Sequence, residues 1–222
     1  MEKNFIRGLK AALPIALGYL PLGMAFGILA AQQGLTAQDV FFLSLLVYAG
    51  SAQFIASAMI ASGAASAAVI LTTFLVNLRH LLMSASLAPF LKHISTPMLT
   101  WISIGITDET YAAGYPEAYS CKAAPAFFLG LNSLSYFSWI FATVSGCLLG
   151  VRIPNPEIFG LDFALPAMFI ALLFMQLKNK TDVFVAMTAG IMSIFFTFFM
   201  KDNFNIIAAT AAAACLGVLV EK

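Results

Sequence analysis

The stretch Ala123–Gly150, AAPAFFLGLNSLSYFSWIFATVSGCLLG, contains no charged residue and decides the fold class of this chain. A helix needs about 20 mainly apolar residues to cross the hydrocarbon core of a bilayer, and this stretch is longer than that. It therefore predicts a membrane-spanning helix. Apolar runs elsewhere, such as Ile191–Phe196, do not alternate polar and apolar residues, so the strands of a transmembrane β-barrel are not expected.

The whole chain has the same character as this stretch. Hydrophobic residues make up 61% of its 222 residues, charged residues make up 9%, and the mean hydropathy is +0.94. A soluble domain carries about 25% charged residues, so this chain cannot build a water-facing surface. Its 11 basic and 10 acidic residues nearly balance, which excludes a basic footprint for nucleic acid. We expect a single integral membrane domain over residues 1–222, embedded in a lipid bilayer.

Eight apolar segments predict an all-α polytopic protein. Numbered in order, they are Ala11–Ala31, Val40–Ala61, Ala65–Ala88, Met98–Tyr115, Ala123–Gly150, Leu161–Leu177, Val183–Met200 and Phe204–Val220. Only Lys201-Asp202-Asn203 separates the last two, so the expected number of transmembrane helices is seven to eight. The apolar part of segment one, about 21 residues, exceeds the roughly 7–15 of a signal-peptide core, and further spans follow it. We therefore expect segment one to be a membrane span and not a cleaved signal peptide.

The distribution of Lys and Arg predicts that the N-terminus is cytoplasmic. With eight spans in that orientation, the cytoplasmic segments hold Lys3, Arg7, Lys10, Lys122, Lys178, Lys180 and Lys222, and the outer segments hold Lys92, Arg152 and Lys201. Arg79 is left out of this comparison because it lies inside segment three.

Two short matches suggest an internal repeat. Gly8–Pro14 and Gly160–Pro166 share five of seven residues and lie 152 residues apart. Five spans separate the copies, which would give them opposite topologies, as in the inverted repeats of secondary transporters. The second copy would have fewer spans than the first, so the inverted repeat would be incomplete. Chance similarity in a chain rich in Ala and Leu is the alternative.

Segment two contains Tyr48-Ala49-Gly50-Ser51-Ala52-Gln53-Phe54 near its middle. On an ideal helix Tyr48 and Ser51 share a face, whereas Gln53 points almost oppositely. We therefore expect a broken helix near Gly50, with backbone groups freed for binding. Half-helix ends at this depth bind charged groups of transported substrates, so Tyr48, Gly50, Ser51 and Gln53 are candidate substrate-binding residues. Close packing of small residues is the alternative interpretation.

Segment three carries a continuous polar stripe. Thr73, Asn77, His80 and Ser84 follow one another at helical spacing, and Arg79 lies about 100° from His80. Ionisable residues within a span are expensive and are functional candidates by default. We expect Asn77 and Arg79 to bind substrate and His80 to take part in proton coupling. Alternatively, Arg79 and His80 lie near the membrane surface and extend toward it.

Segment four places two adjacent carboxylates, Asp108 and Glu109, inside an apolar stretch. One of them can pair with Arg79 across helices. The other can titrate, because desolvation raises the pKa of a carboxyl group. Both are candidate proton-coupling residues. If the segment ended at Ile106 instead, only nine residues from Met98 would remain, which is too few to span.

Two glycine pairs, Gly23-x-x-x-Gly27 and Gly146-x-x-x-Gly150, are typical of close helix contacts. Signals for catalysis are weak. Ser51 and His80 could form an intramembrane hydrolase dyad, but Ala49–Gln53 lacks the second glycine of a nucleophile elbow. The three cysteines are scattered, and the motifs of metalloproteases and nucleotide-binding proteins are missing from the sequence. We expect no enzyme, no cofactor and no metal site. A channel for another small solute is the main alternative to a transporter.

Five sequence motifs, in this order and spacing, resemble the AzlC family, the large subunits of two-component branched-chain amino acid exporters. They are Gly18-Tyr19-x-Pro21-x-Gly23-x-Ala25-Phe26-Gly27, Tyr48–Phe54, Asn77-Leu78-Arg79-His80, Thr107-Asp108-Glu109 and Ala164–Phe169. The resemblance covers almost the whole chain. It implies a bacterial cytoplasmic membrane protein that works with a small AzlD-type subunit and exports apolar amino acids, driven by protons. It assigns no site residues.

Overall fold

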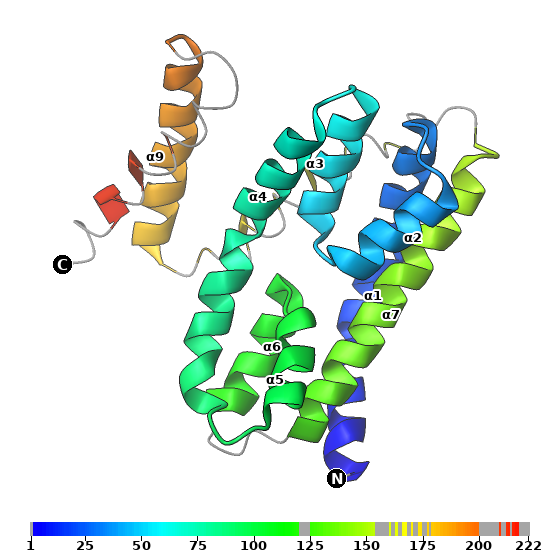
Figure 1. The fold of residues 1–222 in the computed structure, drawn as a ribbon. Coiled ribbons are helices and arrows are strands. Elements are labelled where there is room, and N and C mark those ends of the chain that lie inside the picture. The colour runs from blue at the N-terminus through cyan, green and yellow to red at the C-terminus, as the bar shows by residue number, and fades with distance from the viewer. Residues whose placement is uncertain are drawn as a thin grey trace. The chain divides into compact units, whose positions relative to one another are not determined.

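The structure is a computed structural model of the chain (Figure 1). It describes residues 2–119, 125–153 and 179–199, together with the isolated positions 160, 163, 166–167, 170, 173–174, 177, 209, 212–213 and 215–217. The described residues contain helices and no strand, which confirms the all-α prediction. The chain divides into two compact units, Met1–Leu165 and Pro166–Lys222, and each is described by itself.

Two long helices, α1 (Glu2–Gln32) and α7 (Pro125–Gly150), form the frame of the first unit. Their mutual contact is the most extensive between any two of the described elements. Glycines permit it: a Cβ on Gly27 would strike the Thr143 carbonyl oxygen, and a Cβ on Gly146 would strike the backbone of Met24. Gly8 and Gly130 approach the opposite backbone in the same way. The predicted close contact at the glycine pairs is therefore confirmed.

Segment two is broken, as predicted. Helix α2 (Ala37–Leu46) ends before Tyr48, whose φ of 39° lies in the left-handed region, and α3 (Gly50–Ala61) begins directly afterwards. The chain reverses at this break: Phe54 on α3 packs in one cluster with Leu35, which precedes α2, and with Val40 in the first turn of α2. The two half-helices thus form a hairpin whose two ends lie at the same end of the α1–α7 frame (Figure 1).

Segment four was expected to be one continuous helix, and this expectation is wrong. Helix α5 (Thr96–Ile104) stops at Gly105, and α6 (Asp108–Tyr119) starts anew because Thr107 caps it. The Thr110 backbone N–H donates to Thr107 Oγ1 at 3.2 Å, and Thr110 Oγ1 donates to the Gly105 carbonyl at 2.7 Å. Ala118 of α6 packs in one cluster with Leu91, which precedes α5, so this pair of half-helices also folds back.

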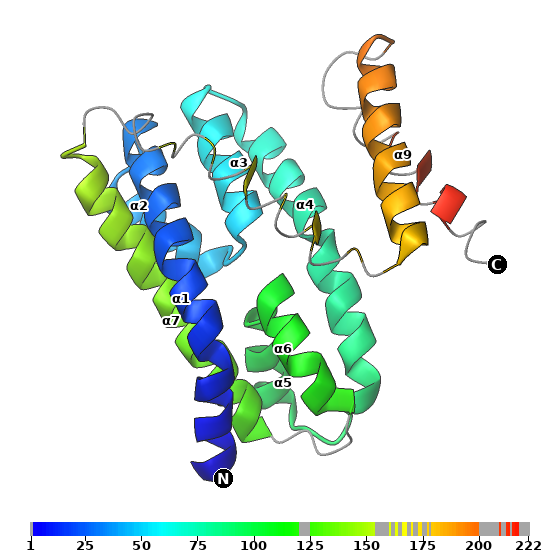
Figure 2. The same cartoon turned by 180° about the vertical axis from the view of Figure 1, so that it is seen from behind.

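The two hairpins enter from opposite ends of the frame, and their tips meet between those ends. Helix α4 (Ser66–Leu87), extended by the 3₁₀ turn η1 (Ala88–Phe90), connects them. In Figures 1 and 2, α2 lies beside the upper half of α7 and α3 lies beside α4, whereas α5 and α6 lie beside the lower half of α7. A long helix followed by a hairpin therefore occurs twice, in opposite directions. This inverted arrangement differs from the predicted inverted repeat. The second copy of the predicted repeat, Gly160–Pro166, lies largely outside the described residues.

Four described helices are long and apolar enough to cross a membrane: α1, α4 with η1, α7, and α9 (Lys180–Thr197) of the second unit. They correspond to segments one, three, five and seven. Segments two and four form the hairpins, and segments six and eight lie largely outside the described residues. The predicted count of seven to eight spans is therefore not confirmed.

Candidate functional site

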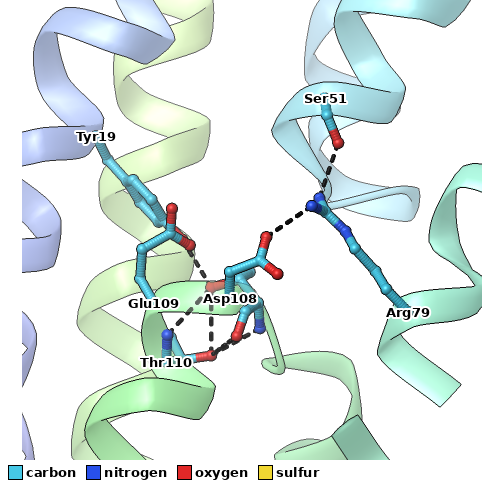
Figure 3. A network of polar contacts seen from close by, with 7 residues as sticks. Tyr19, Ser51, Arg79, Asp108, Glu109 and Thr110 are labelled. Atoms are coloured by element: carbon cyan, nitrogen blue, oxygen red, sulfur yellow. Dashed lines mark hydrogen bonds and ion pairs between the residues drawn. The ribbon is translucent and has the colours of Figure 1, made fainter. Parts of the chain in front are cut away.

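Arg79 of α4 lies at the point where the two hairpin tips meet (Figure 3). Its Nη1 atom is 2.8 Å from Asp108 Oδ2 of α6, and its Nη2 donates to Ser51 Oγ of α3 at 2.8 Å. The side chains of Arg79 and Asp108 remain 30% and 22% exposed. Three residues predicted from three separate segments are thus brought together by one guanidinium group. The arrangement leaves this group both paired and accessible.

The positive ends of two helix dipoles point toward this meeting point. Helix α6 begins at Asp108, and its first turn is capped by Thr107. Helix α3 begins at Gly50, and its N-cap residue, Ala49, provides no side-chain acceptor for the first backbone N–H groups. A helix N-terminus of this kind attracts anionic groups. The tip of α3 next to Arg79 is accordingly suited to a carboxylate.

Glu109 lies beside Asp108 in sequence but has different neighbours. Its Oε2 accepts a hydrogen bond from the Tyr19 hydroxyl of α1 at 2.8 Å (Figure 3). The Tyr19 hydroxyl also lies 2.8 Å from Thr107 Oγ1. No Lys, Arg or His nitrogen of the described residues lies within 4.0 Å of the Glu109 carboxylate. The charge of Arg79 is therefore matched by Asp108, whereas that of Glu109 is not matched by a cation.

Aromatic side chains surround the hairpin tips. The rings of Tyr19 and Trp139 lie 5.1 Å apart, and those of Tyr48 and Tyr136 lie 4.6 Å apart. Trp101 of α5 adds a further ring 6.0 Å from Tyr136. The predictions named only Tyr48 among these five. Tyr19 lies in the first motif of the family resemblance, and that motif was the one available signal for it.

Gln53 holds the α2–α3 hairpin against α7. Its Oε1 accepts from Trp139 Nε1 at 2.7 Å, and its Nε2 donates to Ser44 Oγ at 2.9 Å. Ser44 in turn bonds Thr143 Oγ1 at 2.9 Å. All of these side chains are buried. The amide of Gln53 is thus engaged in packing, whereas Ser51 on the same helix turns toward Arg79.

Several buried polar atoms around the hairpin tips have no hydrogen-bond partner among the described residues. They are Tyr48 Oη, Asn77 Oδ1, Arg79 Nε, His80 Nε2, Trp101 Nε1 and Ser135 Oγ, and just one further atom of this kind, Gln33 Oε1, lies elsewhere. Buried polar groups in proteins are almost always paired. The concentration of these atoms around the tips indicates a place where a polar molecule can bind. The predicted residues Asn77 and His80 belong to this group.

The described residues contain no group of His, Cys, Asp and Glu side chains that could hold a metal ion. The groups that the site does offer suit a small molecule with both charges: the Arg79 guanidinium and the N-terminus of α3 for an anion, and the Glu109 carboxylate with aromatic rings for a cation.

Comparison with known proteins places the site in a family context. A family model described as AzlC protein matches residues 14–153. An inner membrane protein of Escherichia coli, YgaZ, is 30% identical over 82% of this chain and 77% of its own length. A membrane protein of Archaeoglobus fulgidus is 33% identical over 96% of this chain and 93% of its own. The branched-chain amino acid transport protein AzlC of Bacillus subtilis is 27% identical over 93% and 80%. No solved structure gives a significant match.

Proposed function

The chain belongs to the AzlC family of membrane transport proteins, and from that premise we propose that it exports branched-chain or similar apolar amino acids. The Bacillus subtilis relative, a branched-chain amino acid transport protein, supports this substrate class. We further propose that the chain works with a small AzlD-type subunit in the bacterial cytoplasmic membrane, and that proton entry drives export.

The observation that carries the proposal is the position of Arg79 between the tips of two half-helices. An amino acid presents a carboxylate and an ammonium group a few ångströms apart. Arg79 and the uncapped N-terminus of α3 suit the carboxylate, and the Glu109 carboxylate on α6 suits the ammonium group. Half-helices that end near the middle of the membrane are the usual binding elements of secondary transporters.

The hairpins also suit the proposed transport cycle. Because α2–α3 and α5–α6 enter from opposite ends of the frame, each would separate the site from a different side of the membrane. A substrate held at Arg79 could leave by displacement of one hairpin while the other stays closed. Alternating access of this kind requires only local movement around a fixed site.

Efflux measurements with a matched arginine pair test the proposal. Cells that express the chain with its small subunit are loaded with valine or leucine, and export is followed after dilution. We expect Arg79→Gln to reduce export at least tenfold, because the site loses its anion-binding group. Arg7→Gln is the control: Arg7 also pairs with a carboxylate, Glu117 at 2.7 Å, but its side chain is 56% exposed and it lies at the start of α1.

Equal export by the Arg79→Gln variant and the unmodified chain, at equal amounts in the membrane, would contradict the assigned site. Absence of export for every apolar amino acid, with both subunits present, would contradict the proposed function itself.

A further inference from the structure

The two adjacent carboxylates of the site differ in their charge balance. One positive group, Arg79, faces two negative ones, and Asp108 is the one it pairs with at 2.8 Å. Glu109 accepts a hydrogen bond from Tyr19, a neutral donor. The described site therefore keeps one unmatched negative charge, and that charge belongs to Glu109. An unmatched charge in a membrane interior is costly, so a cation that neutralises this carboxylate is favoured at its position.

The surroundings of Glu109 suit a cation as well as a proton. The ionisable groups on the elements packed around it are Tyr19 on α1, Tyr48 between α2 and α3, Arg79 and His80 on α4, Asp108 on α6, and Tyr136 on α7. Tyr48 is 4% exposed, and its side chain packs in one cluster with Tyr19, the hydrogen-bond donor to Glu109. The faces of these aromatic rings attract an ammonium group.

We propose that Glu109 binds either a proton or the ammonium group of the substrate, and never both. This inference rests on the proposed function as an amino acid transporter. The neutral carboxyl group offers no negative charge to an ammonium ion. Binding of the zwitterion therefore leaves the carboxylate ion-paired and releases the carboxyl proton to solvent. No bond other than the O–H bond of Glu109 changes.

This competition couples the two fluxes at one residue. A site that carries the proton cannot carry the substrate on the same passage, so proton entry and amino acid exit alternate. Asp108 has a separate role in this scheme as a positioning residue, because it holds the Arg79 guanidinium beneath the N-terminus of α3. Glu109 thus couples proton binding to substrate binding, and Asp108 positions Arg79.

The competition predicts proton release by the purified two-subunit complex. When leucine binds in weakly buffered solution, we expect up to one proton per bound leucine to appear, detected with a pH-indicator dye. Leucine affinity should fall as the pH falls, by up to about tenfold per pH unit, because one proton is exchanged. The matched ligand is 2-hydroxy-4-methylpentanoate, in which a hydroxyl replaces the ammonium group. It should bind without proton release and without this loss of affinity at low pH.

Two isosteric variants separate the adjacent carboxylates. Glu109→Gln should abolish proton release and make the affinity for leucine independent of pH, while 2-hydroxy-4-methylpentanoate still binds. Asp108→Asn should weaken binding but keep the release of protons per bound leucine. Equal pH dependence for both ligands in the unmodified protein would overturn the inference, as would proton release by Glu109→Gln. An unmodified complex that binds neither leucine nor valine at any pH would instead overturn the proposed function.

Discussion

Gln53 is held by two buried hydrogen bonds, and both lead to groups outside its own helix. Replacement by leucine would leave the Trp139 indole N–H without an acceptor in a buried position. We expect Gln53→Leu to lower the free energy of unfolding by about 1–3 kcal/mol, the usual cost of one unsatisfied buried group. The measurement is the thermal unfolding midpoint in detergent.

Ser57→Ala on the same helix is the control for this prediction. Ser57 is equally buried, but its hydroxyl bonds only the Phe54 carbonyl of its own helix. It should shift the midpoint much less. If both variants unfold alike, the bridge through Gln53 does not hold the hairpin to α7.

At the scale of single residues, the sequence revealed the charged groups and missed the aromatic ones. Arg79, Asp108 and Glu109 are conspicuous because charges are rare in apolar segments. Tyr19, Trp101 and Trp139 are not conspicuous, because aromatic residues are common in membrane helices. Their positions at the site depend on which turn of each helix meets the hairpin tips, and this depends on tertiary packing. The pairing of Arg79 with a segment-four carboxylate was predicted, whereas which of the two carboxylates would pair was left open.

At the scale of elements, the frame depends on the absence of side chains at the α1–α7 contact. A Cβ on Gly27 would overlap the Thr143 carbonyl oxygen and the Cys147 backbone nitrogen of α7. Backbone cannot move away as a flexible side chain can, so the helices must separate. We expect Gly27→Ala to destabilise the protein by about 1–3 kcal/mol, the usual effect of overpacking.

Gly18→Ala provides a control within the same helix, because nothing lies within 4 Å of a Cβ at that position. It should leave the thermal unfolding midpoint unchanged or raise it slightly. A loss of stability at Gly18 that equals the loss at Gly27 would contradict close contact as the cause, because Ala has the higher helix propensity and nothing obstructs a Cβ at Gly18.

The two hairpins show which features of the helices the local sequence predicts and which it does not. Gly50 among small residues indicated the first break, and the structure has it. The second break had a signal that was not used: Thr107 followed by an acidic pair and Thr110 is typical of a helix start. The requirement for about 20 residues per span favoured one continuous helix there instead. Reversal at each break could not be predicted, because a half-helix can continue across the membrane or turn back with the same sequence.

At the scale of the whole molecule, the hairpins change the expected topology of the first unit. The start of α2 and the end of α3 lie at one end of the α1–α7 frame, and the start of α5 and the end of α6 lie at the other. Lys3, Arg7, Lys10 and Lys92 then share one side, and Arg152 lies on the opposite side. The predicted straight spans had placed Lys92 with Arg152. With the hairpins, the asymmetry of positive charge therefore favours a cytoplasmic N-terminus more strongly than it does with straight spans.

Cysteine labelling in intact cells tests this topology. In a chain without its three native cysteines, Gln38→Cys and Ser62→Cys flank the α2–α3 hairpin, and both positions are exposed. We expect a membrane-impermeant maleimide to label both from outside, and Ser95→Cys to be labelled only after the cells are opened. Labelling of Gln38→Cys and Ser62→Cys from opposite sides would restore segment two as a straight span.

The α1–α7 frame also has a consequence for how the protein is made. Helix α1 ends at Gln32 and α7 begins at Pro125, so both hairpins leave the ribosome before the frame can close. Until α7 arrives, Ser44 and Gln53 lack their partners on it, and the polar tips meet lipid or the insertion machinery. Such long-range closure is slow. A nascent chain that stops before α7 therefore keeps unpaired polar groups within the membrane.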